Sequence, residues 1–80
     1  MKLPRDVSGE KLARALGRVG YRVTRQTGSH IRLTIDEPPE HHLTIPAHSE
    51  LKAGTLSAIL SMASERLHMS REKLLAALKL

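Results

Sequence analysis

The chain has 80 residues, a length that predicts one domain over residues 1–80 with a small core. It contains no cysteine, which excludes disulfides, thiolate metal sites and cysteine nucleophiles. Phe and Trp are absent and Tyr21 is the single tyrosine, so the core must be aliphatic. Such a core leaves little volume for a deep apolar pocket, and no cofactor is expected.

Lysine and arginine total 13 against eight acidic residues, which gives a formal net charge of +5. A basic surface attracts polyanions, whether nucleic acid, an anionic membrane or an acidic protein, and charge alone does not choose among them. No stretch approaches the roughly 20 apolar residues of a membrane span. The first six residues lack the apolar run of a signal peptide, so we expect a cytoplasmic protein.

The first predicted helix begins at Ser8, a good N-cap, and ends at Gly20, a residue suited to a left-handed cap. Val7 and Leu12 can form a hydrophobic staple around the cap. The apolar positions predicted to face the core are Leu12, Leu16 and Val19. Beside them, Lys11, Arg14 and Arg18 form a basic stripe, which suits phosphate contact or, alternatively, an ordinary solvated surface.

Three runs predict an antiparallel meander: residues 21–25, 30–35 and 42–45, the last stopped by Pro46. Residues 26–29 suit a hairpin loop in which Gly28 can take positive φ. Residues 36–40 contain two prolines and predict a turn. Within the middle run Ile31, Leu33 and Ile35 alternate with polar residues, which predicts one face in the core and one outside.

The C-terminal part predicts two helices. Thr55 can cap the first, and Gly54 allows a close approach of the chain at its start. Its core stripe comprises Leu56, Ile59, Leu60, Ala63 and Leu67. Ser70 can cap the second helix, whose stripe comprises Leu74, Leu75 and Leu78. The order predicts an α+β two-layer sandwich, α-β-β-β-α as in the double-stranded-RNA-binding domain, with an extra short C-terminal helix.

Five histidines invite the hypothesis of a metal site. His41 and His42 are adjacent, so on a strand they point to opposite faces and do not easily bind one ion. His30, His42 and His48 could converge across a turn, but their spacing matches no zinc signature. We therefore expect no metal site.

His30 is the residue best placed for chemistry. Alternation turns it away from Ile31 and out of the core, with Arg32 two residues along the same face. An exposed imidazole beside cations can take the proton of an RNA 2′-hydroxyl while the cations stabilise the crowded phosphorane. DNA lacks that hydroxyl and cannot react in this way. The plainer alternative is a surface histidine without a catalytic role.

Three motifs occur together: a helix ending in Leu16-Gly17-Arg18-Val19-Gly20-Tyr21, a central Arg25-Gln26-Thr27-Gly28-Ser29-His30, and the downstream pair Pro46-Ala47-His48 and Lys52-Ala53-Gly54-Thr55-Leu56. In this combination the chain resembles the HicA toxin family of toxin–antitoxin systems over nearly its whole length. The resemblance implies ribosome-independent, metal-independent cleavage of mRNA, with His30 as the catalytic histidine. It also implies a HicB-type antitoxin that covers His30.

Two features depart from the family pattern. Many relatives have a basic residue where this chain has Ser57, and the segment Ala63 to Met69 is longer than usual.

The residues expected to contact RNA are Arg5, Lys11, Arg14, Ser29, Arg32, Lys52 and Gly54. Two alternatives to the ribonuclease toxin are a non-catalytic RNA-binding module of the same fold and a DNA-binding or antitoxin-like regulator. The regulator is least favoured, because no helix-turn-helix spacing is present.

Overall fold

The computed structural model describes residues 3–80. Its elements are α1 (Gly9–Leu16), the 3₁₀ turn η1 (Gly17–Val19), β1 (Arg22–Gln26), β2 (His30–Ile35), β3 (His41–Pro46), α2 (Ala53–Leu67) and α3 (Arg71–Leu78). This order confirms the predicted α+β class and the α-β-β-β-α layout with an extra C-terminal helix. Among residues 3–80, no helix combines the length and the apolar character needed to cross a membrane.

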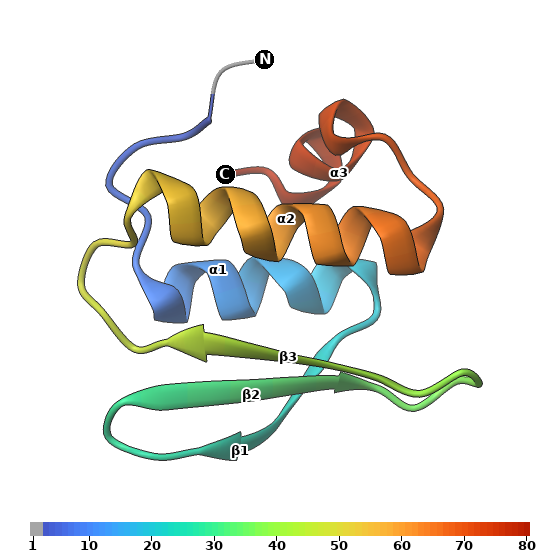
Figure 1. Cartoon of the computed structure of the whole chain (residues 1–80), viewed down its shortest axis with the longest axis horizontal. Coiled ribbons are helices and arrows are strands. Elements are labelled where there is room, and N and C mark those ends of the chain that lie inside the picture. Colours follow the sequence, from blue (N-terminus) through green and yellow to red (C-terminus); the bar gives the residue numbers. More distant parts are fainter. Residues whose placement is uncertain (1–2) are drawn as a thin grey trace.

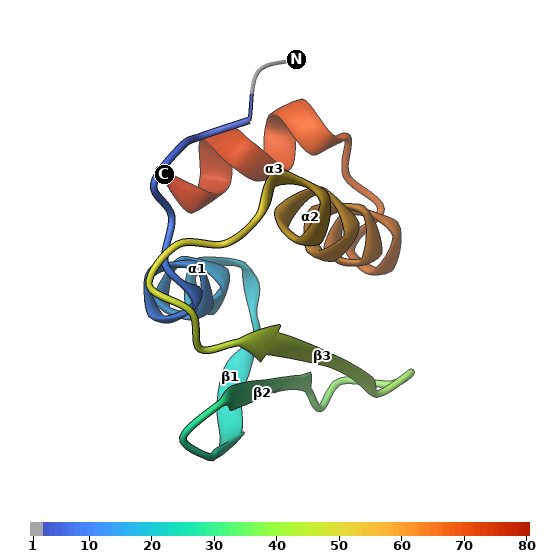
Figure 2. The same cartoon turned by 60° about the vertical axis from the view of Figure 1, so that its left-hand side comes forward.

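The strands form an antiparallel sheet in the order β1-β2-β3. All three helices lie on one side of this sheet, and the other side is left open (Figure 1). After a turn of the view, α1 and α2 still lie over the sheet, and α3 lies beyond them (Figure 2). The sheet therefore has a core face and an open face, and residues that alternate along a strand divide between the two.

The core lies between the sheet and the helices and consists of aliphatic side chains. Its fully buried large residues come from every layer: Leu12, Leu16, Ile31, Leu33, Leu43, Ile45, Leu56, Leu60, Leu74 and Leu78. Burial of each such side chain stabilises the fold by about 1.5–3 kcal/mol relative to exposure. The predicted apolar stripes are confirmed at these positions. Three of their members, Val19, Leu67 and Leu75, are only half-buried and lie at the edge of the core.

The first helix begins as predicted. The Ser8 hydroxyl accepts a hydrogen bond from the Lys11 amide at 3.0 Å, and Val7 and Leu12 are both buried. The α-helix ends four residues earlier than predicted, at Leu16, because the chain tightens into η1 before its cap. Gly20 supplies that left-handed cap, with φ of 108°.

Gly9, the first residue of α1, packs directly against the backbone at the end of β3. A Cβ atom at Gly9 would lie 2.0 Å from the carbonyl oxygen of Pro46, so only glycine fits this contact. The Gly9 amide also donates to the His48 carbonyl at 3.0 Å. The start of α1 is therefore held against the end of β3 by backbone contact.

The first strand differs from the prediction in its position and burial. It begins at Arg22, and its five residues are all exposed, whereas Tyr21 just before it is buried. The ladder between β1 and β2 shifts register between Val23 and Arg25, which is a β-bulge at Thr24. Strict alternation fails because β1 is an edge strand and the bulge adds a residue to the open face.

The loop between β1 and β2 is also shorter than predicted, and Gly28 does not take positive φ. Thr27 closes this loop instead. Its amide donates to the His30 carbonyl at 2.9 Å, and its hydroxyl accepts from the His30 amide at 3.1 Å. These bonds fix the backbone of His30 at the start of β2.

The start of α2 corrects two expectations. Lys52, not Thr55, occupies the N-cap position, and it provides no side-chain cap. Gly54 makes no close approach, since a Cβ there would meet no atom within 4 Å. The long segment from Ala63 continues α2 to Leu67, and His68 ends it in the left-handed conformation. Ser70 caps α3 as predicted, accepting from the Lys73 amide at 3.1 Å.

Candidate active site

His30 is the first residue of β2 and lies exposed on the open face of the sheet. It pairs with Pro46 of β3, and the Ala47 amide donates to the Ser29 carbonyl at 2.9 Å. Ile31, the next residue, points into the core and is 1% exposed. The imidazole therefore stands on a rigid backbone without being part of the core.

Only one ring nitrogen of His30 is engaged within residues 3–80. Its Nδ1 lies 3.0 Å from the hydroxyl oxygen of Ser29, and no hydrogen bond to a described residue reaches Nε2. When Nδ1–H donates to the hydroxyl, Nε2 carries the lone pair and faces solvent. Ser29, expected as an RNA contact, is thus placed to orient the ring. The arrangement leaves Nε2 free to exchange a proton with a bound molecule.

Two arginines lie farther along the open face from His30. Arg32 follows His30 on the same face of β2, about 7 Å along the strand. Arg25 of β1 lies directly opposite Arg32 in the sheet register. Neither arginine belongs to the two ion pairs found among residues 3–80. Two like charges opposite each other are unfavourable in a sheet, so this pair favours the binding of an anion.

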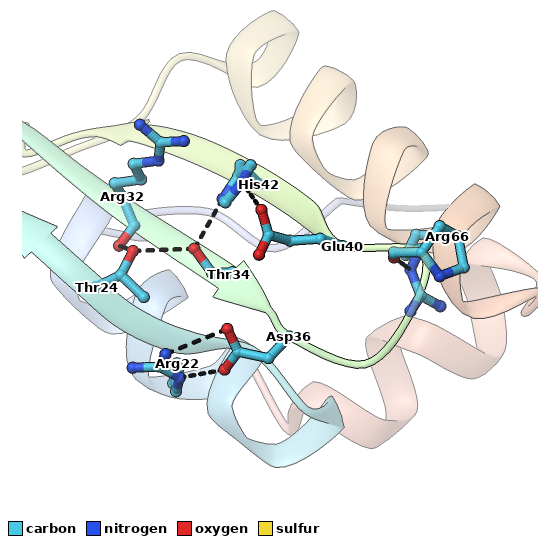
Figure 3. Close-up of polar contacts among 9 residues, drawn as sticks. Arg22, Thr24, Arg32, Thr34, Asp36, Glu40, His42 and Arg66 are labelled. Carbon is cyan, nitrogen blue, oxygen red and sulfur yellow. Dashed lines mark hydrogen bonds and ion pairs between the residues drawn. The ribbon is translucent and has the colours of Figure 1, made fainter.

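A chain of hydrogen bonds crosses the rest of the open face (Figure 3). The hydroxyls of Thr24 and Thr34 are 2.9 Å apart, and Thr34 Oγ1 lies 2.8 Å from His42 Nδ1. His42 Nε2 lies 2.8 Å from a Glu40 carboxylate oxygen. Thr34 is only 3% exposed although it faces away from the core. The open face thus contains an ordered polar cluster formed by three strands.

An ion pair borders the cluster. The guanidinium of Arg22 is paired with the Asp36 carboxylate in two hydrogen bonds. The hydrogen bond from Arg22 holds the pKa of Asp36 below its usual value. Asp36 is thereby kept charged and committed to Arg22, so it does not neutralise Arg25 or Arg32.

The basic stripe of α1 does not join His30. Lys11 and Arg14 are exposed on the helix layer, where they line a depression with Arg18 and Lys79. Arg18 also donates to the Leu78 carbonyl at 2.9 Å. The open face of the sheet and the basic stripe are therefore separate surfaces.

Lys52 and Gly54 lie at the start of α2, and Arg5 lies in the segment before α1. In Figure 1 the starts of α1 and α2 lie at the same end of the molecule as the β1–β2 loop and the end of β3.

Arg5 lines a depression with Asp6 and Glu50. A hydrogen bond with Asp6 and the nearby charge of that carboxylate raise the pKa of Glu50.

The other histidines are dispersed. His41 Nδ1 lies 2.8 Å from the hydroxyl of the buried Tyr21, whose pKa is raised by its burial. His48 follows β3, and His68 ends α2. Within residues 3–80, no three His, Asp or Glu side chains are grouped so that they could hold a metal ion.

Sequence reasoning missed Arg25 and the cluster of Thr24, Thr34, Glu40 and His42 as parts of one surface. The alternation of β2 placed His30, Arg32 and Thr34 on one face, but their partners depend on the register with β1 and β3. The bulge at Thr24, which brings Arg25 opposite Arg32, has no clear sequence signal.

The layout and the open sheet face define a small α+β protein of the double-stranded-RNA-binding-domain type. A family model described as "HicA toxin of bacterial toxin-antitoxin" matches residues 9–64, and the chain belongs to this family. It is thus the toxin of a toxin–antitoxin pair. No curated protein and no solved structure matched the chain. The match contains His30, Arg25 and Arg32, and α3 lies beyond it.

Proposed function

We propose that this toxin is an endoribonuclease that cleaves mRNA, with His30 as the general acid–base group. The observation that carries the proposal is the exposed imidazole of His30, which is bonded at Nδ1 to Ser29, has no partner for Nε2 among residues 3–80, and lies on the same face as Arg32. Family membership supports it, since HicA toxins are associated with ribonuclease activity. The expectation that no metal is needed comes from the family resemblance alone.

The reaction follows from the position of Nε2. This atom takes the proton of the 2′-hydroxyl, the 2′-oxygen attacks the adjacent phosphorus, and the bond to the 5′-oxygen breaks. The protonated imidazole then returns a proton to the leaving 5′-oxygen. The products are a 2′,3′-cyclic phosphate and a 5′-hydroxyl. The positive charge of Arg32, about 7 Å along β2, favours the negative charge that develops on the phosphorane oxygens without contacting them.

The alternative function is RNA binding without catalysis, because other proteins of the same fold bind RNA and do not cleave it. We expect purified wild-type protein to cleave single-stranded RNA in the presence of EDTA. Gel analysis of the products checks this. Protein that binds RNA but leaves it intact would favour the non-catalytic module. Cleavage that stops in EDTA and resumes when a divalent metal is added would show that the reaction needs a metal ion and is not carried by His30 alone.

The remaining RNA contacts extend from this site. Lys52 and the backbone of Gly54 lie at the start of α2, where free amides and the helix dipole favour a phosphate. Arg5 lies near this end of the molecule, whereas Lys11 and Arg14 provide a separate basic surface on α1. We infer that these residues contact phosphates of a longer RNA. Action on mRNA would place the protein in the cytoplasm.

The antitoxin is inferred to be HicB-like and to cover His30. A protein with net charge +5 and a cationic open face is complementary to an acidic partner. We expect co-expression to give a stable complex in which RNA cleavage is suppressed and whose association slows as salt is raised. Measured cleavage by the purified complex at the rate of free toxin would contradict this proposal.

A further inference from the structure

The polar cluster on the open face surrounds a shallow pocket of about 300 Å³. Its lining includes Thr24, Arg25, Arg32, Thr34, Glu40 and His42. We propose that this pocket binds the nucleotide next to the scissile phosphate: Arg25 and Arg32 hold its phosphate, and the ring of His42 stacks on its base. The inference rests on the proposed function, because it takes the RNA cleaved at His30 as the ligand.

The arginine pair provides the phosphate site. Arg25 and Arg32 face each other across β1 and β2, are exposed, and have no acidic partner among residues 3–80. Two acidic residues line the pocket, and both have other partners: Asp36 is paired with Arg22 and Glu40 with His42. Guanidinium groups bind phosphate oxygens in a fork, so two arginines at paired positions of neighbouring strands can share one phosphate group. The bound anion would also relieve the repulsion between the two cations.

The hydrogen bonds of His42 indicate that its ring serves as a stacking surface and not as a proton donor or acceptor for the substrate. Both ring nitrogens are engaged, Nδ1 with Thr34 and Nε2 with Glu40, so neither is open to the substrate for proton transfer. The same two bonds fix the plane of the ring. Thr24 supports the arrangement by bonding the nearly buried Thr34 hydroxyl. An oriented imidazole beside a phosphate site is a surface on which a base can stack.

The composition of the chain strengthens this assignment. Single-stranded nucleic acid is usually held by aromatic side chains together with cations. The one Phe, Tyr or Trp residue of the chain is Tyr21, and it is 3% exposed on the helix side of the sheet. Base stacking on the open face must therefore use histidine rings or guanidinium planes.

The spacing along β2 connects the pocket to the catalytic residue. Arg32 lies two residues from His30, about 7 Å away, and Thr34 with its partner His42 lies about 13 Å away. The shorter distance is similar to that between successive phosphates of an extended strand. An RNA strand that runs along β2 thus places one phosphate at His30, the next between the arginines, and its base toward His42.

The phosphate site is tested by binding, in a His30→Ala background that removes the need for cleavage. The probe is a fluorescent single-stranded RNA of random sequence, followed by anisotropy at several salt concentrations. We expect Arg25→Gln to weaken binding at least about fivefold and to flatten the log–log salt slope by about 0.7. Lys73→Gln on α3 makes the same charge change away from the sheet and should have little effect. Equal affinities for these two variants would overturn the phosphate site.

The stacking role is tested with two replacements of His42 in the same assay. We expect His42→Ala to weaken binding about five- to tenfold, and His42→Phe to restore it, because phenyl keeps a stacking surface without hydrogen bonds. A residue with only a structural role would not show this rescue. Unchanged binding in His42→Ala, or equal weakness in both variants when circular dichroism shows both folded, would overturn the stacking role.

These outcomes separate the subsite from the catalytic proposal. Wild-type protein that binds RNA through Arg25 and His42 but never cleaves it would contradict the endoribonuclease alone. Cleavage and binding that are both unchanged in Arg25→Gln and His42→Ala would contradict the subsite alone.

Discussion

His30→Ala is expected to lower RNA cleavage by about 10²–10⁴-fold, the usual contribution of one general acid–base group. The fold should remain intact, because the ring projects from the open face and its removal leaves Ile31 in the core. The bonds from Thr27 that fix this position involve the backbone of residue 30, so they survive the substitution. RNA binding should persist through the arginine pair.

The measurement compares cleavage rates and growth inhibition for wild-type and variant proteins. His68→Asn provides a matched control, since His68 ends α2 with φ of 55°, a conformation that asparagine tolerates. It should retain the wild-type rate. A folded His30→Ala protein that cleaves RNA normally would rule out the catalytic role of His30.

Gly9→Ala is expected to cause the largest loss of stability, about 3 kcal/mol, near the upper end for overpacking. The new Cβ would lie 2.0 Å from the Pro46 carbonyl oxygen, and a backbone atom cannot rotate away. The start of α1 must therefore move from the end of β3, with loss of the bond from Gly9 to His48. Because Pro46 is the ladder partner of His30, activity should fall as well.

Thermal unfolding followed by circular dichroism measures this effect, and the melting temperature should fall by roughly 12–24 °C for a domain of this size. Gly17→Ala is the matched control. Gly17 has helical angles, and a Cβ there would meet no atom within 4 Å, so that variant should be as stable as wild type or more stable. If the Gly9→Ala protein were as stable as the Gly17→Ala protein, the close contact between residue 9 and the Pro46 carbonyl would not require glycine, and the prediction would be wrong.

Much of the fold followed from periodicity and capping. The caps at Ser8 and Ser70 and the alternation of β2 are local features, and the residues that carry them are close in sequence. The outward position of His30 follows from the same alternation, because its neighbour Ile31 belongs to the core. These features could be predicted because each depends on one segment of the chain.

The remaining features depend on contacts between segments. The bulge at Thr24 sets Arg25 opposite Arg32, and the register of β2 with β3 brings His42 to Thr34. The need for glycine at position 9 arises from the Pro46 carbonyl, 37 residues away in the sequence. Local propensity also misplaced the start of α2, where Thr55 was the better cap by residue type but Ala53 already belongs to the helix.

The most direct measurement of the central proposal, proton removal from a 2′-hydroxyl by His30, uses one RNA oligonucleotide in two forms. The first is all RNA, and the second has a single 2′-deoxy nucleotide at the mapped cleavage position. Both are incubated with wild-type protein in EDTA, and the ends of the products are analysed. We predict that the first is cut to a 2′,3′-cyclic phosphate and a 5′-hydroxyl, and that the second stays intact at that position. Cleavage of the 2′-deoxy position at a comparable rate would contradict the proposed chemistry.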